Sequence, residues 1–258
     1  MADPGPGRFI AFANELADLA AATIRPHFRQ PIAVESKADQ TPVTVADRAA
    51  EAAMRRRIEA EFPAHGIIGE EFGRVREDAD YLWVLDPIDG TKSFISGVPL
   101  FGTLIALLRH GRPILGVIDQ PISRERWVGA AGRTTLNGAP VRARPCPNLG
   151  AATLFSATLD MFRGSEIAAF DRLRADVRLV RWSADCYAYA LLATGFVDLV
   201  AEASMKPYDY AALIPVVEGA GGTISDWHGR PLTLESDGRV LAAGDAALHA
   251  AAVRLLAI

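Results

Sequence analysis

Apolar side chains recur at helical spacing in two stretches near the N-terminus. Between residues 8 and 28 they recur at steps of three and four, which places them on one face of a helix ending near Pro26. A second helix is expected from Thr44 to Phe62, with Pro63 closing it. The first sixty residues are therefore predicted to supply two amphipathic helices.

Short, continuous apolar runs follow these helices. Residues 81–85 are interpreted as a buried strand that Pro87 ends. Further strands are predicted at 100–108, 114–119 and 126–130, with turn signals rich in Gly and Pro between them. This part of the chain is expected to form a sheet of successive strands.

The segment 140–150 is rich in Pro and Arg and has little periodicity. We interpret it as the junction between two packed halves, about 1–142 and 143–258, of a single domain. Beyond it, strand and helix signals alternate, at 153–156, 165–174, 177–182, 184–194, 196–202, 209–219, 223–226, 240–243 and from Asp245. Such a mixture predicts stacked layers of helices and sheets, an α/β or α+β sandwich.

Composition narrows the class of protein. Half of the 258 residues are apolar, and 27 Lys plus Arg against 31 Asp plus Glu give a net charge of −4. A globular protein with a sizeable core is expected, and nucleic-acid binding is disfavoured because it needs a basic face. No apolar run is long enough to span a bilayer, and the first residues do not resemble a signal peptide. With two cysteines and no zinc-binding spacing, a cytoplasmic setting is the expectation.

Two acids lie in a turn directly after a predicted buried strand. Asp86 follows the strand, and Asp89 comes three residues later, between Pro87 and Gly90. Two carboxylates confined beside a hydrophobic sheet repel each other and are costly to desolvate, and a divalent cation relieves both problems. Oxygen ligands without His or Cys select Mg²⁺ or Mn²⁺. The pattern therefore suggests a metal site.

Each acid also has a purely structural interpretation. Asp and Gly are ordinary turn formers, and Glu70 with its neighbour Glu71 fits a solvated loop. Asp209 fits the positive end of the helix that it begins. Asp47 and Thr44 fit a capping box. Taken one at a time, none of these residues establishes chemistry.

The residues after the acidic turn suggest an anion site. Residues 91–94 are predicted to form a helical turn whose free N–H groups would hold a phosphate. A metal pair above such a turn suits in-line displacement at phosphorus, since the metals activate water and stabilise the leaving oxygen. The hypothesis at this point is a metal-dependent phosphomonoesterase.

Three separated motifs resemble the inositol monophosphatase family of the lithium-sensitive phosphatase superfamily. The first combines Gly69-Glu70-Glu71 with Asp86-Pro87-Ile88-Asp89-Gly90-Thr91. The second is Asp209 at the start of a helix that ends in a Gly-rich turn at 218–222, and the third is the upstream element 41–47. Their order and spacing agree from about Arg8 to the C-terminus. The resemblance implies an αβαβα layered sandwich and a homodimer.

The resemblance also implies metal ligands. One Mg²⁺ would be held by Glu70, Asp86 and the carbonyl of Ile88, and a second by Asp86, Asp89 and Asp209. Glu70 would also help to bind a weaker third ion, and Mn²⁺ could replace Mg²⁺.

The implied catalytic groups lie beside these ligands. Thr91, oriented by Asp47, would help to position and deprotonate the attacking water, together with Glu70. The amides of Gly90 and Thr91 would bind the phosphate. Water would attack directly, without a phospho-enzyme.

Departures from the usual pattern resemble the histidinol-phosphatase branch of the family. Lys92-Ser93 stands where inositol phosphatases more often carry Thr-Asn, Asp185 stands where they have a small residue, and Tyr208 replaces a Trp. Histidinol phosphate carries an ammonium and an imidazole, so Asp185 and Glu202 could pair with the cationic amine. Asp185 could instead be the N-cap or a first-turn acid of the following helix.

We therefore predict hydrolysis of the small metabolite L-histidinol phosphate. Arg181 would either neutralise Asp185 or contact the phosphate. Inositol-1-phosphate, or a broad range of sugar and polyol phosphates, is the alternative substrate. A catalytically silent metal-binding regulatory protein is the alternative of another class. An aspartyl-nucleophile phosphatase is disfavoured, because Asp78-Ala79-Asp80 precedes its strand and lacks the required Thr.

Overall fold

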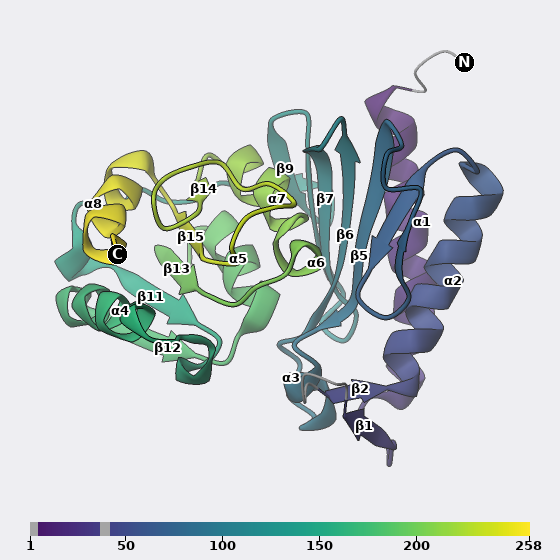
Figure 1. Cartoon of the computed structure of the whole chain (residues 1–258), viewed down its shortest axis with the longest axis horizontal. Helices are drawn as coiled ribbons and strands as arrows, with labels where there is room; N and C mark the ends of the chain where they lie inside the picture. Colours follow the sequence, from purple (N-terminus) through teal and green to yellow (C-terminus); the bar gives the residue numbers. More distant parts are fainter. Residues whose placement is uncertain (1–4, 37–41) are drawn as a thin grey trace.

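Two long helices form one outer layer of the molecule. The computed structural model describes residues 5–36 and 42–258. Helices α1 (Pro6–Ile24) and α2 (Val45–Glu61) pack side by side and bury their apolar faces against a large sheet (Figure 1). A short 3₁₀ turn, η1 (Arg25–His27), follows α1. Both predicted helices are confirmed, with ends that differ by one to four residues.

The large sheet has eight strands in the order β10-β9-β8-β7-β6-β5-β3-β4. Neighbours are antiparallel except β3 and β5, which are parallel. The strands are β3 (Gly66–Gly69), β4 (Gly73–Val75), β5 (Tyr81–Asp89), β6 (Gly102–Arg109), β7 (Arg112–Gln120), β8 (Glu125–Ala130), β9 (Arg133–Leu136) and β10 (Ala139–Pro140). A separate two-stranded sheet contains β1 (Val34–Ser36) and β2 (Pro42–Thr44).

Strand β5 continues through Pro87 to Asp89, so the prediction that Pro87 ends the strand is wrong. The pairing with β6 shifts register between Asp86 and Asp89. A proline is tolerated at such a bulge because no ladder hydrogen bond is needed from it there. Its carbonyl accepts a hydrogen bond from Thr103 Oγ1 at 2.8 Å. The bulge places two acids at the carboxyl end of a central strand.

A second helical layer separates the large sheet from a smaller one. It contains α5 (Asp185–Ala193), α6 (Pro207–Tyr210) and α7 (Leu213–Gly219), in green between the two sheets of Figure 1. The contact of α7 with the large sheet is close: a Cβ at Gly129 would lie 2.2 Å from the carbonyl oxygen of Pro215. Glycine is therefore required at that position of β8.

The smaller sheet has five strands in the order β12-β11-β13-β15-β14. Its outer face is covered by α4 (Ser165–Asp176) and α8 (Ala246–Leu256) (Figure 1). The strands are β11 (Thr153–Ser156), β12 (Leu179–Trp182), β13 (Leu199–Glu202), β14 (Thr223–Ser225) and β15 (Val240–Ala243). Counted across the molecule, the layers run helix, sheet, helix, sheet, helix. The predicted αβαβα sandwich is confirmed.

The helix predicted at 209–219 is two helices. The chain turns at residues 211–212, between α6 and α7. Pro215 explains the break, because it has no N–H to donate to the carbonyl of Ala211 and its ring would clash with that carbonyl. Asp209 consequently lies in a four-residue helix of its own, which begins at Pro207.

Residues 141–148, which contain no helix or strand, lead from the large sheet to the small one. The turn η2 (Leu149–Ala151) follows them. They coincide with the predicted junction; the single-domain assignment with two halves stays a prediction. Within the described ranges, no helix has the length and apolar character needed to cross a membrane.

His65 lies in an aromatic cluster beneath α1. Its ring stacks on Phe62 at 4.5 Å and on Tyr81 at 4.9 Å between centroids. Trp83 Nε1 donates a hydrogen bond to His65 Nδ1 at 3.1 Å. Burial lowers the pKa of His65 from 6.5 to about 4. The folded protein therefore holds this imidazole neutral.

Because His65 is held neutral, we expect the folded protein to lose stability in acid. Between pH 6.5 and 4 the unfolded chain binds a proton at His65 that the folded protein does not, so stability falls as the pH falls. We expect the Tm of the wild type to drop by about 2–4 °C more than that of His65→Gln between pH 7 and 5. Thermal melts at both pH values test this, with the exposed His110→Gln as control. Equal drops in wild type and His65→Gln would contradict it.

Candidate active site

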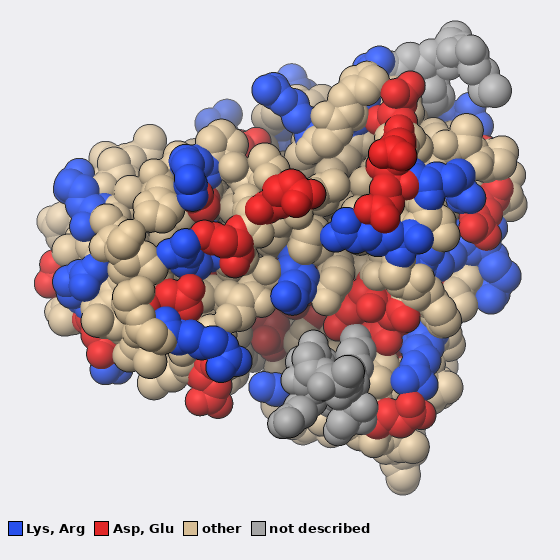
Figure 2. All heavy atoms as spheres, in the orientation of Figure 1, with Lys and Arg blue, Asp and Glu red and all other residues tan. Residues whose placement is uncertain are grey.

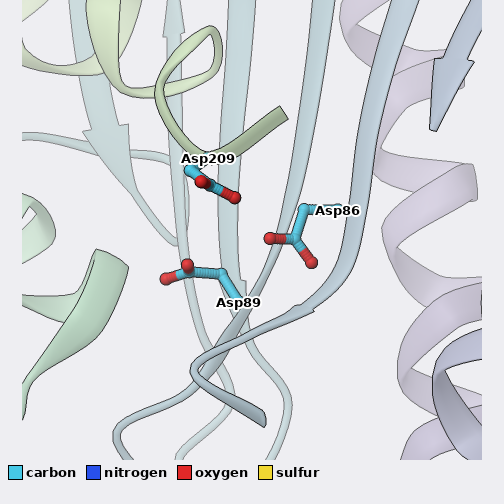
Figure 3. Close-up of side chains that lie close together, drawn as sticks. All are labelled: Asp86, Asp89 and Asp209. Atoms are coloured by element: carbon cyan, nitrogen blue, oxygen red, sulfur yellow. The ribbon is translucent and has the colours of Figure 1, made fainter. Parts of the chain in front are cut away.

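Carboxylates from two distant segments meet where the bulge of β5 faces α6. Asp86, Asp89 and Asp209 each offer an oxygen, and these oxygens lie within 4.8 Å of one another. Figure 3 shows Asp209 approaching from the opposite side of the cluster to the two acids of β5. Asp86 is 2% exposed, whereas the other two are partly exposed.

Backbone N–H groups fix the orientation of each carboxylate. Asp86 Oδ1 accepts a hydrogen bond from the amide of Ile88 at 3.0 Å. Asp89 Oδ2 accepts one from the amide of Cys186, the second residue of α5, at 2.6 Å. Asp209 Oδ2 accepts one from the amide of Lys206, which precedes α6, at 2.7 Å. The cluster is thus held in place by three separate elements.

The electrostatics of the cluster favour a bound cation. Burial, followed by the charges of Glu70, Asp89 and Asp209, raises the pKa of Asp86 well above its usual value. Burial and the charge of Asp185 raise the pKa of Asp89 to about 7. Burial and the charge of Asp89 raise the pKa of Asp209 well above its usual value. A divalent cation would favour the charged forms again. The all-oxygen donor set fits a hard ion such as Mg²⁺ or Mn²⁺.

A cavity of about 500 Å³ opens over these acids. Acidic atoms are set back in the hollow between the two sheet-containing parts of the molecule (Figure 2). The structure brings all the predicted metal ligands to this cavity wall, together with the predicted phosphate-binding residues. These residues are Glu70, Asp86, Ile88, Asp89, Gly90, Thr91 and Asp209.

A larger cavity, of about 970 Å³, lies between α1 and strands β7 to β9. Its two acids, Asp18 and Asp119, both form ion pairs with Arg126, at 2.7 and 2.6 Å. Because these acids pair with an arginine and Arg25, Arg124 and Arg133 also line the cavity, it does not offer the metal-binding chemistry of the acidic cluster.

Thr91 follows the acids at the start of α3 (Thr91–Ile95), and Gly90 makes the sharp turn with a φ of 85°. The hydroxyl oxygen of Thr91 lies 3.1 Å from the carbonyl oxygen of Ile88 and 3.5 Å from Asp47 Oδ1. Thr91 and Asp47 therefore lie side by side, as their predicted roles require.

Asp47 also has the structural role that its sequence context predicted. Its Oδ2 accepts hydrogen bonds from the amide and the hydroxyl of Thr44 at 2.9 and 2.6 Å, which completes the capping box of α2. Asp47 is fully buried, and burial raises its pKa. One carboxylate thus anchors α2 with one oxygen and faces Thr91 with the other.

Asp185 contacts Ser93, another residue at which this sequence departs from the usual family pattern. It is the first residue of α5, with a φ of 44°, and its side chain does not cap the helix. Instead Asp185 Oδ2 accepts a hydrogen bond from Ser93 Oγ at 2.7 Å. Burial raises the pKa of Asp185, opposed by Ser93 and by the charge of Lys92. Asp185 is therefore not the N-cap residue, but it is an acid in the first turn of α5, as the alternative interpretation also allowed.

Glu202 lies at the end of β13, beside a smaller cavity of about 190 Å³ that Asp185 also lines. It is 3% exposed, and its carboxylate accepts hydrogen bonds from the amide of Ala157 and the hydroxyl of Tyr189, both at 2.9 Å. Burial and the charge of Asp89 raise its pKa to about 8.

Arg181 does not join this group. It lies exposed on the edge strand β12 and lines neither of the two cavities beside the acidic cluster. In the described part of the chain Arg181 forms no ion pair with Asp185, and its contact with phosphate stays a prediction.

Sequence reasoning missed Glu51. It is fully buried on α2 and accepts hydrogen bonds from the amides of Glu71 and Phe72, directly after Glu70. The signal available was its spacing of four residues from Asp47, which puts both acids on one face of a helix.

Comparison with known proteins identifies the family of this chain. The family model described as inositol monophosphatase family matches residues 7–257. The chain belongs to this family. It is accordingly a phosphoric monoester hydrolase, and the resemblance of its motifs is confirmed.

Individual relatives are similar over almost the whole chain. The chloroplastic bifunctional phosphatase IMPL2 of Arabidopsis thaliana is 50% identical over 99% of this chain and 77% of its own length. A histidinol-phosphatase of Chlorobaculum parvum is 40% identical over 90% of this chain and 91% of its own. The structure of an inositol monophosphatase from Zymomonas mobilis is 48% identical, with a TM-score of 0.91, over 99% of this chain and 100% of that one. The cytoplasmic location and the homodimer stay predictions.

Proposed function

We propose that this chain hydrolyses L-histidinol phosphate to L-histidinol and phosphate, with Mg²⁺ as cofactor. The observation that carries the substrate assignment is the partly buried Asp185, held by Ser93 at the wall of both cavities beside the acidic cluster. The similarity to proteins named histidinol-phosphatase supports the same choice.

Asp185 is suited to a cationic partner. Enclosure raises its pKa, so its charged form lacks full compensation within the protein. An ammonium or imidazolium group would stabilise that charge through a charge-assisted hydrogen bond. A neutral polyol would gain little from it. Glu202, across the smaller cavity, would be a second acid for the same cationic group.

The reaction follows from the arrangement of the site. Mg²⁺ held by Glu70, Asp86, Asp89, Asp209 and the carbonyl of Ile88 would lower the pKa of water and neutralise charge on phosphate oxygens. The amides of Gly90 and Thr91 would bind the phosphate, and the hydroxyl of Thr91 would hold the attacking water. Asp47, 3.5 Å from that hydroxyl, would orient it and favour removal of the water proton.

The substrate proposal predicts a preference that kinetics can measure. We expect kcat/KM for L-histidinol phosphate to exceed that for inositol-1-phosphate by at least about tenfold, the effect of one charged hydrogen bond. Asp185→Asn should lower the histidinol phosphate value about 10- to 100-fold and leave the inositol value nearly unchanged. Asn keeps an acceptor for Ser93 and tolerates the left-handed backbone, so the variant removes mainly the charge.

Asp160→Asn is the matched control, because Asp160 is an exposed acid on the wall of the same cavity. Its replacement should change neither value appreciably. A clear preference of the wild type for inositol-1-phosphate would reject histidinol phosphate as the substrate. It would favour the alternative, an inositol-phosphate or broad-specificity phosphatase, which the similarity to an inositol monophosphatase supports. Release of phosphate from any of these esters excludes a catalytically silent regulatory protein.

A further inference from the structure

Glu51 is a buried acid outside the set of residues that would contact metal or substrate. It lies on α2 one helical turn after Asp47, and its side chain is fully buried. Glu51 Oε2 accepts a hydrogen bond from the amide of Glu71 at 2.7 Å, and Oε1 accepts one from the amide of Phe72 at 3.1 Å. Its carboxylate is therefore bonded to the loop that leaves β3.

Arg55 completes this contact from the next turn of α2. Its Nε donates to Glu51 Oε1 at 2.7 Å, and its Nη2 donates to the carbonyl of Gly73. The pair of α2 side chains thus binds three successive residues: Glu71 and Phe72 in the loop after β3, and Gly73, the first residue of β4. The buried carboxylate is thus paired with an arginine of the same helix.

Glu70 lies between this contact and the centre of the large sheet. Its amide donates to the carbonyl of Leu85 on β5 at 3.2 Å. The three consecutive amides of residues 70, 71 and 72 are therefore all fixed, the first by β5 and the next two by Glu51. Such restraint defines the direction in which the Glu70 side chain leaves the backbone.

The residue before Glu70 is also adapted to the Glu51 carboxylate. A Cβ at Gly69 would lie 2.0 Å from Glu51 Oε1. Any other residue at 69 would displace the carboxylate from the amides that it binds. Glu51 can therefore bind these amides only if residue 69, at the end of β3, is glycine.

We propose that Glu51 is a positioning residue, which fixes the backbone of residues 70–72 and thereby directs the Glu70 carboxylate into the metal site. The inference rests on the proposed role of Glu70 as a metal ligand. An apolar side chain could fill the same space, since buried ion pairs rarely exceed apolar packing in stability. An apolar side chain would leave the amides of residues 71 and 72 without their acceptor.

Metal binding by the metal-free protein tests the inference without any turnover. We expect Glu51→Ala to weaken Mn²⁺ binding by about 10- to 100-fold, the usual effect of removing a group that orients a metal ligand. Glu51→Gln keeps the shape and one acceptor oxygen, so it should recover part of the affinity. The activating Mg²⁺ concentration should rise in parallel, while kcat at saturating Mg²⁺ falls less. Calorimetry or Mn²⁺ spin resonance gives the affinity.

Asp198→Ala is the matched control for lost stability. Asp198 is also buried, accepts a hydrogen bond from the amide of Thr153 at 2.8 Å, and pairs with Arg144 at 2.7 Å, but it belongs to the small sheet. We expect a similar loss in Tm and unchanged Mn²⁺ affinity. Equal weakening of Mn²⁺ binding by Asp198→Ala would show a general effect and overturn the proposal.

Glu70→Gln separates the two possible failures. If Glu70→Gln weakens Mn²⁺ binding and both Glu51 variants bind as the wild type does, positioning by Glu51 is rejected and the metal site stands. If Glu70→Gln leaves Mn²⁺ binding unchanged, the metal role of Glu70 is rejected, and the positioning role is rejected with it.

Discussion

Replacing Asp86 with Asn is expected to lower kcat by at least about 10²–10³-fold and to remove Mg²⁺ binding, because the charges that hold the cation also stabilise charge in the transition state. Asp86 is the most buried acid of the cluster and is affected by the charges of Glu70, Asp89 and Asp209 at once. No other single substitution should weaken the cluster as much.

The same variant should leave the fold intact. Asn retains an oxygen that accepts the hydrogen bond from the amide of Ile88, so the geometry of the bulge is kept. Removing a negative charge also relieves the repulsion that raises the pKa of Asp86. We therefore expect the Tm of the metal-free variant to equal or exceed that of the wild type.

Three measurements check this prediction: phosphate release at saturating substrate, Mg²⁺ titration calorimetry, and thermal melting without metal. Asp160→Asn, which removes an exposed acid from the same cavity, should behave as the wild type in all three. Near-normal turnover or Mg²⁺ affinity in Asp86→Asn would reject the metal site. A large fall in Tm would show instead that the loss of turnover and Mg²⁺ affinity results from a destabilised fold.

The sequence predicted the long elements of the fold well, because burial imposes a period that many residues repeat. The helices at 8–28 and 44–62 were found in this way, and the long strands of the large sheet were found from their continuous apolar runs. Strands β3 and β4 have four and three residues, too few for any period to show. Their position matters nevertheless, since β3 delivers Glu70 to the site.

The acidic cluster was predictable only in part from local pattern. Asp86 and Asp89 are close in sequence, so one turn can hold both. Asp209 comes from a different layer of the fold, and only the resemblance to a family connected it to them. Pro215 divides its helix in two, a break that apolar periodicity does not register.

Contacts across long sequence separations account for what sequence reasoning missed. Ser93 and Asp185 were each noticed as departures from the usual pattern, yet nothing in the sequence indicated their hydrogen bond across 92 residues. Arg181 was near Asp185 in sequence and was expected beside it. The edge strand β12 leaves it exposed instead. Proximity in sequence is a weak guide where a strand ends and a helix begins.

Replacing Thr91 with Val is expected to lower kcat by about 10²–10⁴-fold, the range for loss of a group that assists proton transfer. Val keeps the shape of Thr91 but cannot hold the attacking water. The proposed metal ligands Asp86, Asp89 and Asp209 are unchanged in this variant, so Mn²⁺ affinity and KM should stay within a few-fold of the wild type. That split distinguishes it from Asp86→Asn, in which affinity and turnover fall together.

Thr91→Ser is the companion variant, because it restores the hydroxyl and should recover most of the turnover. The hydroxyl also faces Asp47 at 3.5 Å, and Asp47→Asn keeps an acceptor for Thr44 while removing the charge. We expect Asp47→Asn to lower kcat less than Thr91→Val, and to add little when the two are combined, since both act on the same proton. Steady-state kinetics at saturating Mg²⁺ compare the wild type, the three single variants and the double variant. If Thr91→Val retains wild-type kcat, or if the two losses multiply, Thr91 and Asp47 do not act as one unit on the attacking water.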